Sequence, residues 1–261
     1  MSNIGTMSNH IEQKLKKFIK LSIPGTVCLA QWLEEVGISR DLQKRYKKSG
    51  WLVPIGTGAF IKIGDKVEWQ GGIYSIQSQL KTLIYPGALT AIAMQGGAHY
   101  IRMGRENLYL FAPLHTKLPK WFKDCEWEVN IRFHQSNFLP AGLGLNDYEV
   151  KDFKIKLSSL ERAILECLHL TPNKVDLVEC YQIMEGLVTL RPKLLQELLE
   201  GCTSIKVIRL FLYMAKKANH PWYKHLNKEK FNIGAGDRSI VKNGVYIASH
   251  KITIPRELSE L

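Results

Sequence analysis

Residues 29–62 carry the pattern that most restricts how this chain can fold. Apolar residues recur at helical spacing from Leu29 to Val36, and a second, strongly basic helix is expected to follow. That helix would run from Ser39, a suitable N-cap, to Ser49. Two short apolar strands then flank Gly56-Thr57-Gly58, which predicts a hairpin. This order is typical of a winged helix-turn-helix, and we expect that fold for the N-terminal part of the chain.

The basic helix is expected to turn one polar face outward. Leu42 and Tyr46 lie one turn apart and face the core in this interpretation, which leaves the basic residues on the opposite face. The major groove of DNA admits one helix, and polar side chains on that helix read the base edges. The competing interpretation is an ordinary solvated helix face. The candidate DNA contacts on the helix and the hairpin are Ser39, Arg40, Gln43, Lys44, Lys47, Lys48, Thr57 and Lys62.

The residue types in this set indicate different roles. Arginine pairs well with guanine and glutamine with adenine, so Arg40 and Gln43 are candidates for reading sequence. Lys48 is placed for contact with phosphate. Lys62 lies on the second hairpin strand, where it would contact the DNA backbone or the minor groove.

Three aromatic residues fall within the same segment. Tyr46, Trp51 and Phe60 are of the residue types that stack on the bases of single-stranded nucleic acids. Their spacing favours burial instead. We therefore expect them in the core of the small domain.

The composition is that of a globular chain of about two domains. It has 261 residues, of which 45% are hydrophobic and 23% charged, enough for a sizeable core. We expect an α+β protein with a winged helix-turn-helix DNA-binding domain over residues 1–72. A larger, mixed α/β and mainly helical C-terminal domain would follow over residues 73–261, with a sub-boundary near 138–150.

Hydrophobic periodicity predicts the remaining elements. An amphipathic helix is expected over residues 9–21, ahead of the winged helix. In the middle of the chain we expect helices at 73–84 and 88–94 and strands at 108–111 and 127–133. In the C-terminal part we expect helices at 159–169, 175–187, 192–199 and 204–218 and a closing hairpin of residues 239–248 and 251–254.

Charge and hydropathy narrow the classes of partner. The formal net charge is +12 and the pI is about 9.4, with the basic excess at both ends of the chain. Such an excess indicates a polyanion, most often nucleic acid, and charge for solubility is the alternative. No apolar run approaches the roughly 20 residues of a membrane helix, and no secretory signal is visible. We expect a soluble, cytoplasmic protein with no membrane partner.

No metal, cofactor or catalytic residue is expected. The five cysteines stand alone without a CxxC pair, and the eight histidines lack the spacing of zinc ligands. Reduced, buried thiols are the favoured interpretation. The sequence has no Gly-x-Ser-x-Gly elbow and no His-Glu-x-x-His motif.

One acidic segment supports an alternative, catalytic function. Residues 147–151 read Asp-Tyr-Glu-Val-Lys, and Asp124 lies upstream. A strand with Glu-x-Lys and an upstream acid is how one broad nuclease fold binds its catalytic metal ion. Such spacing also arises by chance in basic chains, and the same reasoning applies to Asp65 and Glu68. A metal-dependent nuclease of restriction-endonuclease-like type, with Glu149 and Lys151 in its site, is the alternative function.

Two features of the C-terminal third allow two interpretations each. Residues 234–238, Gly-Ala-Gly-Asp-Arg, form a glycine-rich loop whose composition suits phosphate, yet the loop lacks a P-loop ending and a turn is favoured. A second basic group lies at helical spacing further upstream. It would contact DNA flanks or an acidic partner, or would form a solvated face around a buried apolar stripe, which is favoured. The group comprises Lys206, Arg209, Lys216 and Lys217.

The chain resembles AbiEi-type antitoxins over nearly its whole length and in the same order. In the N-terminal part the resemblance lies in residues 42–52 and 56–60. In the C-terminal half it continues through a longer series of motifs. These are residues 184–187, 189–192, 195–199, 202, 206–207, 209–213, 220–222, 234–238 and 252–255.

The resemblance implies a function in phage defence. AbiEi-type proteins are antitoxins of type IV toxin–antitoxin, or abortive-infection, systems. Their winged helix binds inverted repeats in their own promoter as a repressor, and their C-terminal antitoxin domain counters a nucleotidyltransferase-like toxin, usually without a stable complex. By position, the recognition helix would be residues 39–49 and the wing residues 53–63. The wing departs from the family pattern, because its tip has no arginine and Pro54 and Ile55 stand where a basic residue would be more useful.

Three functions are therefore compared. The first is a DNA-binding autorepressor and antitoxin with no catalysis of its own, whose partners are double-stranded promoter DNA and a toxin. The second is the metal-dependent nuclease with a winged-helix targeting domain. The third is an adaptor whose C-terminal domain binds a partner protein.

Overall fold

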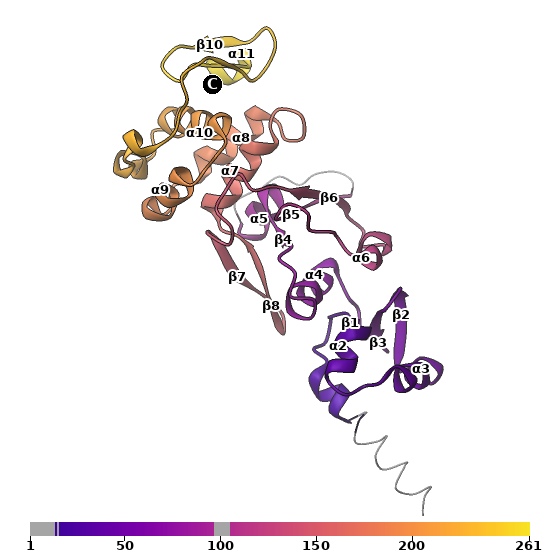
Figure 1. The fold of residues 1–261 in the computed structure, drawn as a ribbon. Helices are drawn as coiled ribbons and strands as arrows, with labels where there is room; N and C mark the ends of the chain where they lie inside the picture. Colours follow the sequence, from indigo (N-terminus) through magenta and orange to yellow (C-terminus); the bar gives the residue numbers. More distant parts are fainter. Residues whose placement is uncertain (1–13, 15, 97–104) are drawn as a thin grey trace, which may run out of the picture. The chain divides into compact units, whose positions relative to one another are not determined.

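The computed structural model describes residues 14, 16–96 and 105–261 of the chain (Figure 1). The fold is mixed α+β, as expected, with several small sheets among the helices. The residues pack as two compact units. Unit 1 comprises Met1–Ile84, His115–Ile131 and Asp147–Lys156, and unit 2 comprises Tyr85–Leu114, Arg132–Asn146 and Leu157–Leu261. The units follow spatial packing rather than chain order, and the domain boundary after residue 72 stays a prediction.

The winged helix-turn-helix lies in unit 1 (Figure 1). Residues 16–21 are helical, while residues 9–13 and 15 of the helix expected there lie outside the described residues. The helix pair is α2 (Ala30–Glu35) and α3 (Arg40–Lys48). The hairpin is β2 (Leu52–Gly56) and β3 (Ala59–Lys62), and β1 (Cys28–Leu29) pairs antiparallel with β3 to give the strand order β1-β3-β2.

A single apolar core joins these elements. It contains Phe18, Cys28, Ala30, Leu33, Ile38, Leu42, Tyr46, Leu52 and Phe60. The prediction of core aromatics is confirmed for Tyr46 and Phe60, which are nearly inaccessible. It is wrong for Trp51, whose side chain is exposed because it precedes the first inward-facing residue of β2, Leu52.

The rest of unit 1 adds short elements to this core. Helix α4 (Trp69–Ser78) begins four residues before the expected start at residue 73 and ends earlier than expected, close to Lys81, which has a left-handed φ of 52°. Helix α6 (Lys120–Asp124) buries Trp121 and Phe122. Strands β7 (Leu145–Val150) and β8 (Phe153–Ser158) form a two-stranded sheet.

Unit 2 is mainly helical. Its α-helices are α5 (Ala88–Met94), α7 (Leu160–Leu170), α8 (Leu177–Gly186), α9 (Pro192–Glu200), α10 (Ile205–Lys217) and α11 (Arg256–Glu260). Two 3-10 helices, η1 (Pro221–His225) and η2 (Lys228–Lys230), follow α10. Helices α7 to α10 have nearly their expected bounds, and side chains of Ser159, Asp176 and Ser204 cap three of them.

Two small sheets complete the fold. In the first, β4 (Tyr85–Pro86), β5 (Asn107–Ala112) and β6 (Asn130–Gln135) lie in that order. In the second, β10 (Val245–Ile247) and β11 (Ile252–Ile254) form the expected closing hairpin. Its first strand is shorter than expected, and β9 (Arg238–Ser239) adds to β11 in parallel.

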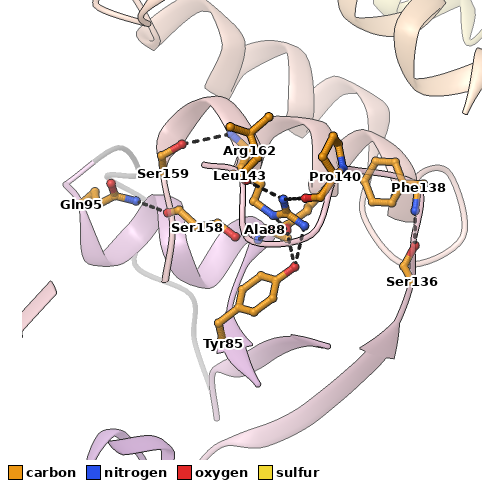
Figure 2. A network of polar contacts seen from close by, with 11 residues as sticks. Tyr85, Ala88, Gln95, Ser136, Phe138, Pro140, Leu143, Ser158, Ser159 and Arg162 are labelled. Atoms are coloured by element: carbon orange, nitrogen blue, oxygen red, sulfur yellow. Dashed lines mark hydrogen bonds and ion pairs between the residues drawn. The ribbon is translucent and has the colours of Figure 1, made fainter. Parts of the chain in front are cut away.

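A buried arginine fixes the centre of unit 2 (Figure 2). Arg162 on α7 forms an ion pair with Glu166 one turn later, with 2.9 Å between Nε and Oε1. The guanidinium also donates to the carbonyl oxygens of Pro140 at 2.9 Å and Leu143 at 2.6 Å and to the Tyr85 hydroxyl at 2.8 Å. One side chain thereby links α7 to β4 and to the segment before β7.

Glu166 is also held by several hydrogen bonds. It is completely buried and accepts hydrogen bonds from the backbone N–H of Ala88 at 3.0 Å and the hydroxyl of Ser158 at 2.8 Å. The close approach of the Glu166 carboxylate to the backbone requires glycine at position 87, where a Cβ atom would lie 2.3 Å from Oε2 of Glu166. Each of these partners donates to the carboxylate, as a buried anion requires.

Among the described residues, no helix combines the length and apolar character needed to cross a membrane.

Candidate nucleic-acid interface

Helix α3 begins with a side-chain cap. The Ser39 hydroxyl accepts from the backbone N–H of Leu42 at 3.4 Å, as predicted from the sequence. Asp41 lies in the first turn and three basic residues in the last, an order that suits the helix dipole. The sequence therefore stabilises a short helix despite its high positive charge.

The outward face of α3 is strongly basic. The helix has five basic residues and one acidic residue, all of them exposed. Arg40, Lys44 and Lys48 follow at intervals of four residues and therefore share one face. Lys47 borders this stripe on one side. Arg45, which is absent from the sequence-based candidates, borders it on the other and could have been found from the helical periodicity alone.

Gln43 does not belong to this face, and its expected placement on the exposed side of the helix is wrong. Its side chain is only 2% exposed. The amide nitrogen donates to the backbone oxygens of Ala30 at 3.0 Å and Ile38 at 2.9 Å. The amide therefore satisfies carbonyls at the start of α2 and before α3. Gln43 faces inward because it lies three residues before Tyr46, on the adjoining side of the buried face.

Two of the basic residues on α3 already have carboxylate partners. Arg40 Nε lies 2.8 Å from Oε2 of Glu34, and Lys44 Nζ lies 3.2 Å from Oδ1 of Asp41. All four side chains are well exposed, so these pairs are weak and exchange readily with other anions. Lys47 instead lies 5.6 Å from the ring centroid of Phe60, which connects α3 to β3.

The wing offers less positive charge than α3. Thr57 is exposed in the turn between β2 and β3, where Gly58 has the left-handed φ of 70° that the turn needs. Lys62 is only 20% exposed in its side chain and lies 3.7 Å from Asp65. The wing surface has exposed Trp51 and Val53 near its base.

The acidic residues of the nuclease alternative do not converge. Lys156 lies 2.8 Å from Asp147, and Lys154 lies 2.8 Å from Glu149. Both acids on β7 are therefore paired with lysines of the neighbouring strand β8. Lys151 lies 3.8 Å from Glu68. Within the described part of the chain, no three His, Cys, Asp or Glu side chains are grouped as metal ligands.

The second basic group, on α10, is not a uniform solvated face. Lys206 donates to the carbonyl oxygens of His169 at 2.8 Å and Thr171 at 2.7 Å. Arg209 is buried, with 2% exposure. Its expected place on a solvated face is wrong, because its donors are satisfied by a ring of carbonyl groups. Lys216 is exposed, and Lys217 lies 5.7 Å from the ring of Tyr181.

Arg209 also explains the glycine-rich loop. Its guanidinium donates to the carbonyl oxygens of Ile233 at 2.6 Å, Gly234 at 3.1 Å and Gly236 at 2.7 Å and to that of Lys251 at 2.8 Å. A phosphate cradle needs inward N–H groups, whereas this loop presents oxygen atoms to a cation. The loop is therefore a turn around Arg209, which agrees with the favoured interpretation.

Other motifs of the C-terminal half also meet in space. His220 Nε2 lies 2.6 Å from the carbonyl oxygen of Met184, and the Trp222 indole donates to that of Leu187 at 2.9 Å. Arg191 forms two side-chain hydrogen bonds with Glu161, at 3.0 Å and 2.9 Å. These motifs stabilise the helical unit, a role that spacing alone did not indicate.

The helix pair, the three-stranded sheet and the exposed basic α3 define a winged helix-turn-helix protein, here combined with a mainly helical unit. The family model described as transcriptional regulator, AbiEi antitoxin N-terminal domain, matches residues 11–103. The model described as transcriptional regulator, AbiEi antitoxin, type IV TA system, matches residues 105–255. The chain therefore belongs to the AbiEi family of type IV toxin–antitoxin transcriptional regulators.

A solved structure shares the fold. The RV2827C protein from Mycobacterium tuberculosis, known from a crystal structure, is similar with a TM-score of 0.59 and 12% sequence identity. The similarity covers 93% of this chain and 90% of that chain. Among curated proteins, none matches the sequence.

Proposed function

We propose that this antitoxin binds inverted repeats in its own promoter through α3 and represses its operon. Arg40 and Lys44 contact bases or phosphate in the major groove, and Lys47, Lys48 and Arg45 contact the flanking phosphates. Ser39, Thr57 and Lys62 are secondary contacts, because Ser39 caps the helix and Lys62 faces Asp65. On this proposal residues 1–72 are the DNA-binding domain and residues 73–261 the antitoxin domain.

The observation that carries the proposal is the exposed basic stripe of Arg40, Lys44 and Lys48 on a capped helix. The inward side of the same helix is fixed by Leu42, Gln43 and Tyr46, so the stripe has a defined orientation. A basic helix that is exposed along one face and supported by a hairpin is how winged-helix proteins enter the major groove.

Titration of the protein into its own upstream DNA tests this proposal. Fluorescence anisotropy at two salt concentrations, with a scrambled duplex of equal length, separates specific from general affinity. We expect the promoter to be preferred. Arg40→Ala/Lys44→Ala is expected to lose that preference, at a cost of about 1–3 kcal/mol for each residue that reads a base.

A charge-matched variant provides the control. Lys193→Ala/Lys242→Ala removes the same formal charge from two exposed positions in unit 2. It is expected to keep the promoter preference. Equal, weak binding of both duplexes by the unaltered protein would contradict the proposal and leave α3 as a solvated face.

We further propose that the antitoxin domain antagonises a nucleotidyltransferase-like toxin without a stable complex. The support is the family membership of residues 105–255. Co-expression with the neighbouring open reading frame, with a tag on the antitoxin, tests it. Relief of growth arrest without co-purification is the expected result. Stoichiometric co-purification would favour the adaptor function instead.

A further inference from the structure

A cavity of about 350 Å³ opens in unit 2 beside Arg209. Its volume lies at the lower end of small-molecule sites, which span roughly 300–1,000 Å³. One face of α10 provides Arg209, Leu212 and Lys216, at positions i, i+3 and i+7. The remaining wall comes from η1, η2, the loop after η2 and the turn between β10 and β11. These segments contribute Tyr223, Lys228, Ile233, Ser249, His250 and Lys251.

The lining is cationic without an acidic counterpart. Arg209, Lys216, Lys228 and Lys251 line the cavity, and no aspartate or glutamate does so. None of the ion pairs found among residues 105–261 involves these four side chains. The nearby carboxylate of Asp237 lies outside the lining and accepts from the Tyr246 hydroxyl at 2.6 Å.

Buried Arg209 makes this positive charge a fixed property of the cavity. Its partners are four neutral carbonyl groups, which position the guanidinium but do not cancel its charge. Burial together with the charge of Lys216 lowers the pKa of His250. His250 is therefore neutral at pH 7 and able to hydrogen-bond, as it does with the Ser249 hydroxyl at 2.9 Å.

The remaining lining suits the organic part of an anionic ligand. Leu212, Ile233 and the Tyr223 ring provide apolar and aromatic surface. Lys228 Nζ lies 4.2 Å from the centroid of that ring, so cationic and aromatic groups are adjacent. A carboxylate would neutralise only one of the cations, whereas a phosphate monoester has a charge of about −1.5 to −2 at pH 7.

We propose that this cavity binds a small phosphate monoester with a planar ring, in the class of the nucleoside monophosphates. The phosphate lies against Lys216 and Lys251, and the ring lies against Tyr223 and Leu212. The site lies within unit 2, so it is separate from DNA contact by α3 and does not depend on that proposal. The same chemistry exists in a free nucleotide and in the 5′-phosphorylated end of a short strand.

Isothermal titration calorimetry of the full-length protein tests the assignment. The probes are AMP, GMP, CMP and UMP, the four corresponding nucleosides, inorganic phosphate, and a dinucleotide with and without a 5′-phosphate. We expect at least one monophosphate to bind more tightly than both its nucleoside and inorganic phosphate. Preference for the phosphorylated dinucleotide over every free nucleotide would assign the same site to a strand end.

Two matched variants locate the binding. Lys216→Gln/Lys251→Gln is expected to weaken monophosphate binding at least about tenfold, because charge-assisted hydrogen bonds are removed. Lys193→Gln/Lys242→Gln, with the same change in charge, is expected to bind as the unaltered protein does. Thermal melting of each variant confirms that it is folded.

Three results would overturn the proposal. One is the absence of binding by any phosphate-bearing probe at millimolar concentration. Another is equal affinity for inorganic phosphate and for all monophosphates, which would remove the role of the ring. The third is unchanged affinity in folded Lys216→Gln/Lys251→Gln, which would place the binding elsewhere on the chain.

Discussion

Gln43 and Lys44 are adjacent in the chain but differ completely in environment. Gln43 is buried and donates to two backbone carbonyls, whereas Lys44 is exposed and pairs with Asp41. A buried carbonyl that loses its donor costs about 1–3 kcal/mol. On the proposed function, the two neighbours therefore have separate roles, Gln43 in stability and Lys44 in DNA contact.

We predict opposite phenotypes for these neighbours. Gln43→Ala is expected to lower the free energy of unfolding by about 2 kcal/mol, because two buried carbonyls lose a donor, and to leave sequence preference in folded protein unchanged. Lys44→Ala is expected to change stability by less than about 0.5 kcal/mol and to weaken DNA binding. Urea unfolding and anisotropy measure the two effects. A change of preferred base in Gln43→Ala would show that the residue reads DNA.

Individual polar residues are the hardest part of the site to predict. The periodicity of Leu42 and Tyr46 locates the inward face of α3, yet residue type alone places Gln43 outward. Residue type likewise places Arg209 in solvent. Both side chains in fact satisfy carbonyl groups contributed by segments distant in sequence, and no local pattern encodes those partners.

From two histidines in unit 2 we predict that the folded protein becomes less stable in acid. Burial, aided by Lys174 and Lys206, lowers the pKa values of His134 and His169 to about 4. An unfolded histidine titrates near 6.5. Since the folded pKa is the lower one, their contribution is complete above about pH 6.5 and is lost as pH falls toward 4.

Phenylalanine substitution tests this pH dependence. His169 stacks on Phe138 with 4.1 Å between ring centroids, which a phenylalanine can maintain. We expect His134→Phe/His169→Phe to lose less stability between pH 6.5 and pH 4, by on the order of 1 kcal/mol per histidine after solvent screening. Chemical denaturation across this range measures it. Parallel curves for variant and parent would contradict the assignment.

At the scale of elements, helix α7 organises unit 2 through Arg162 and Glu166. These two residues connect α7 to β4, to α5 and to the segment before β7. Removing one member of a buried ion pair leaves the other as an uncompensated charge.

We predict that Glu166→Ala lowers the free energy of unfolding by about 3–5 kcal/mol. Glu197→Ala, which removes an exposed carboxylate from α9, is expected to have almost no effect. Arg162→Met/Glu166→Leu is expected to cost less than the sum of the single changes, because neither charge remains unpaired. Additive costs in a thermal or urea series would argue against a coupled pair.

Elements with local signals are predicted well from the sequence, and elements that depend on distant pairing are not. Apolar periodicity locates α7 to α10, and the Gly-x-Gly turn locates the wing. Strands β1 and β9 are two residues each and exist only through pairing with β3 and β11. Such strands have no period to detect, so sequence alone did not predict them.

At the scale of the whole molecule, net positive charge dominates encounters with polyanions. The chain has a net charge of +12, and α3 concentrates part of it on one face. For promoter binding that neutralises about six phosphates, log K is expected to fall with log[salt] at a slope near −5. Arg40→Ala/Lys44→Ala is expected to reduce the slope by about 1 for each phosphate that the variant no longer touches. Anisotropy over a range of salt measures it, and an unchanged slope would mean that neither residue contacts phosphate.

On the proposed function, the carboxylates of Glu34 and Asp41 compete with DNA for Arg40 and Lys44. These exposed pairs exchange readily, and replacing one anion by another yields little binding free energy. DNA that offers only phosphate contacts therefore gains the least binding free energy. An operator adds base contacts, which no carboxylate can replace. Glu34 would act as an intramolecular competitor of DNA for Arg40. Its removal in Glu34→Gln should strengthen binding to scrambled DNA more than to the promoter, so the antitoxin would gain affinity while becoming less discriminating.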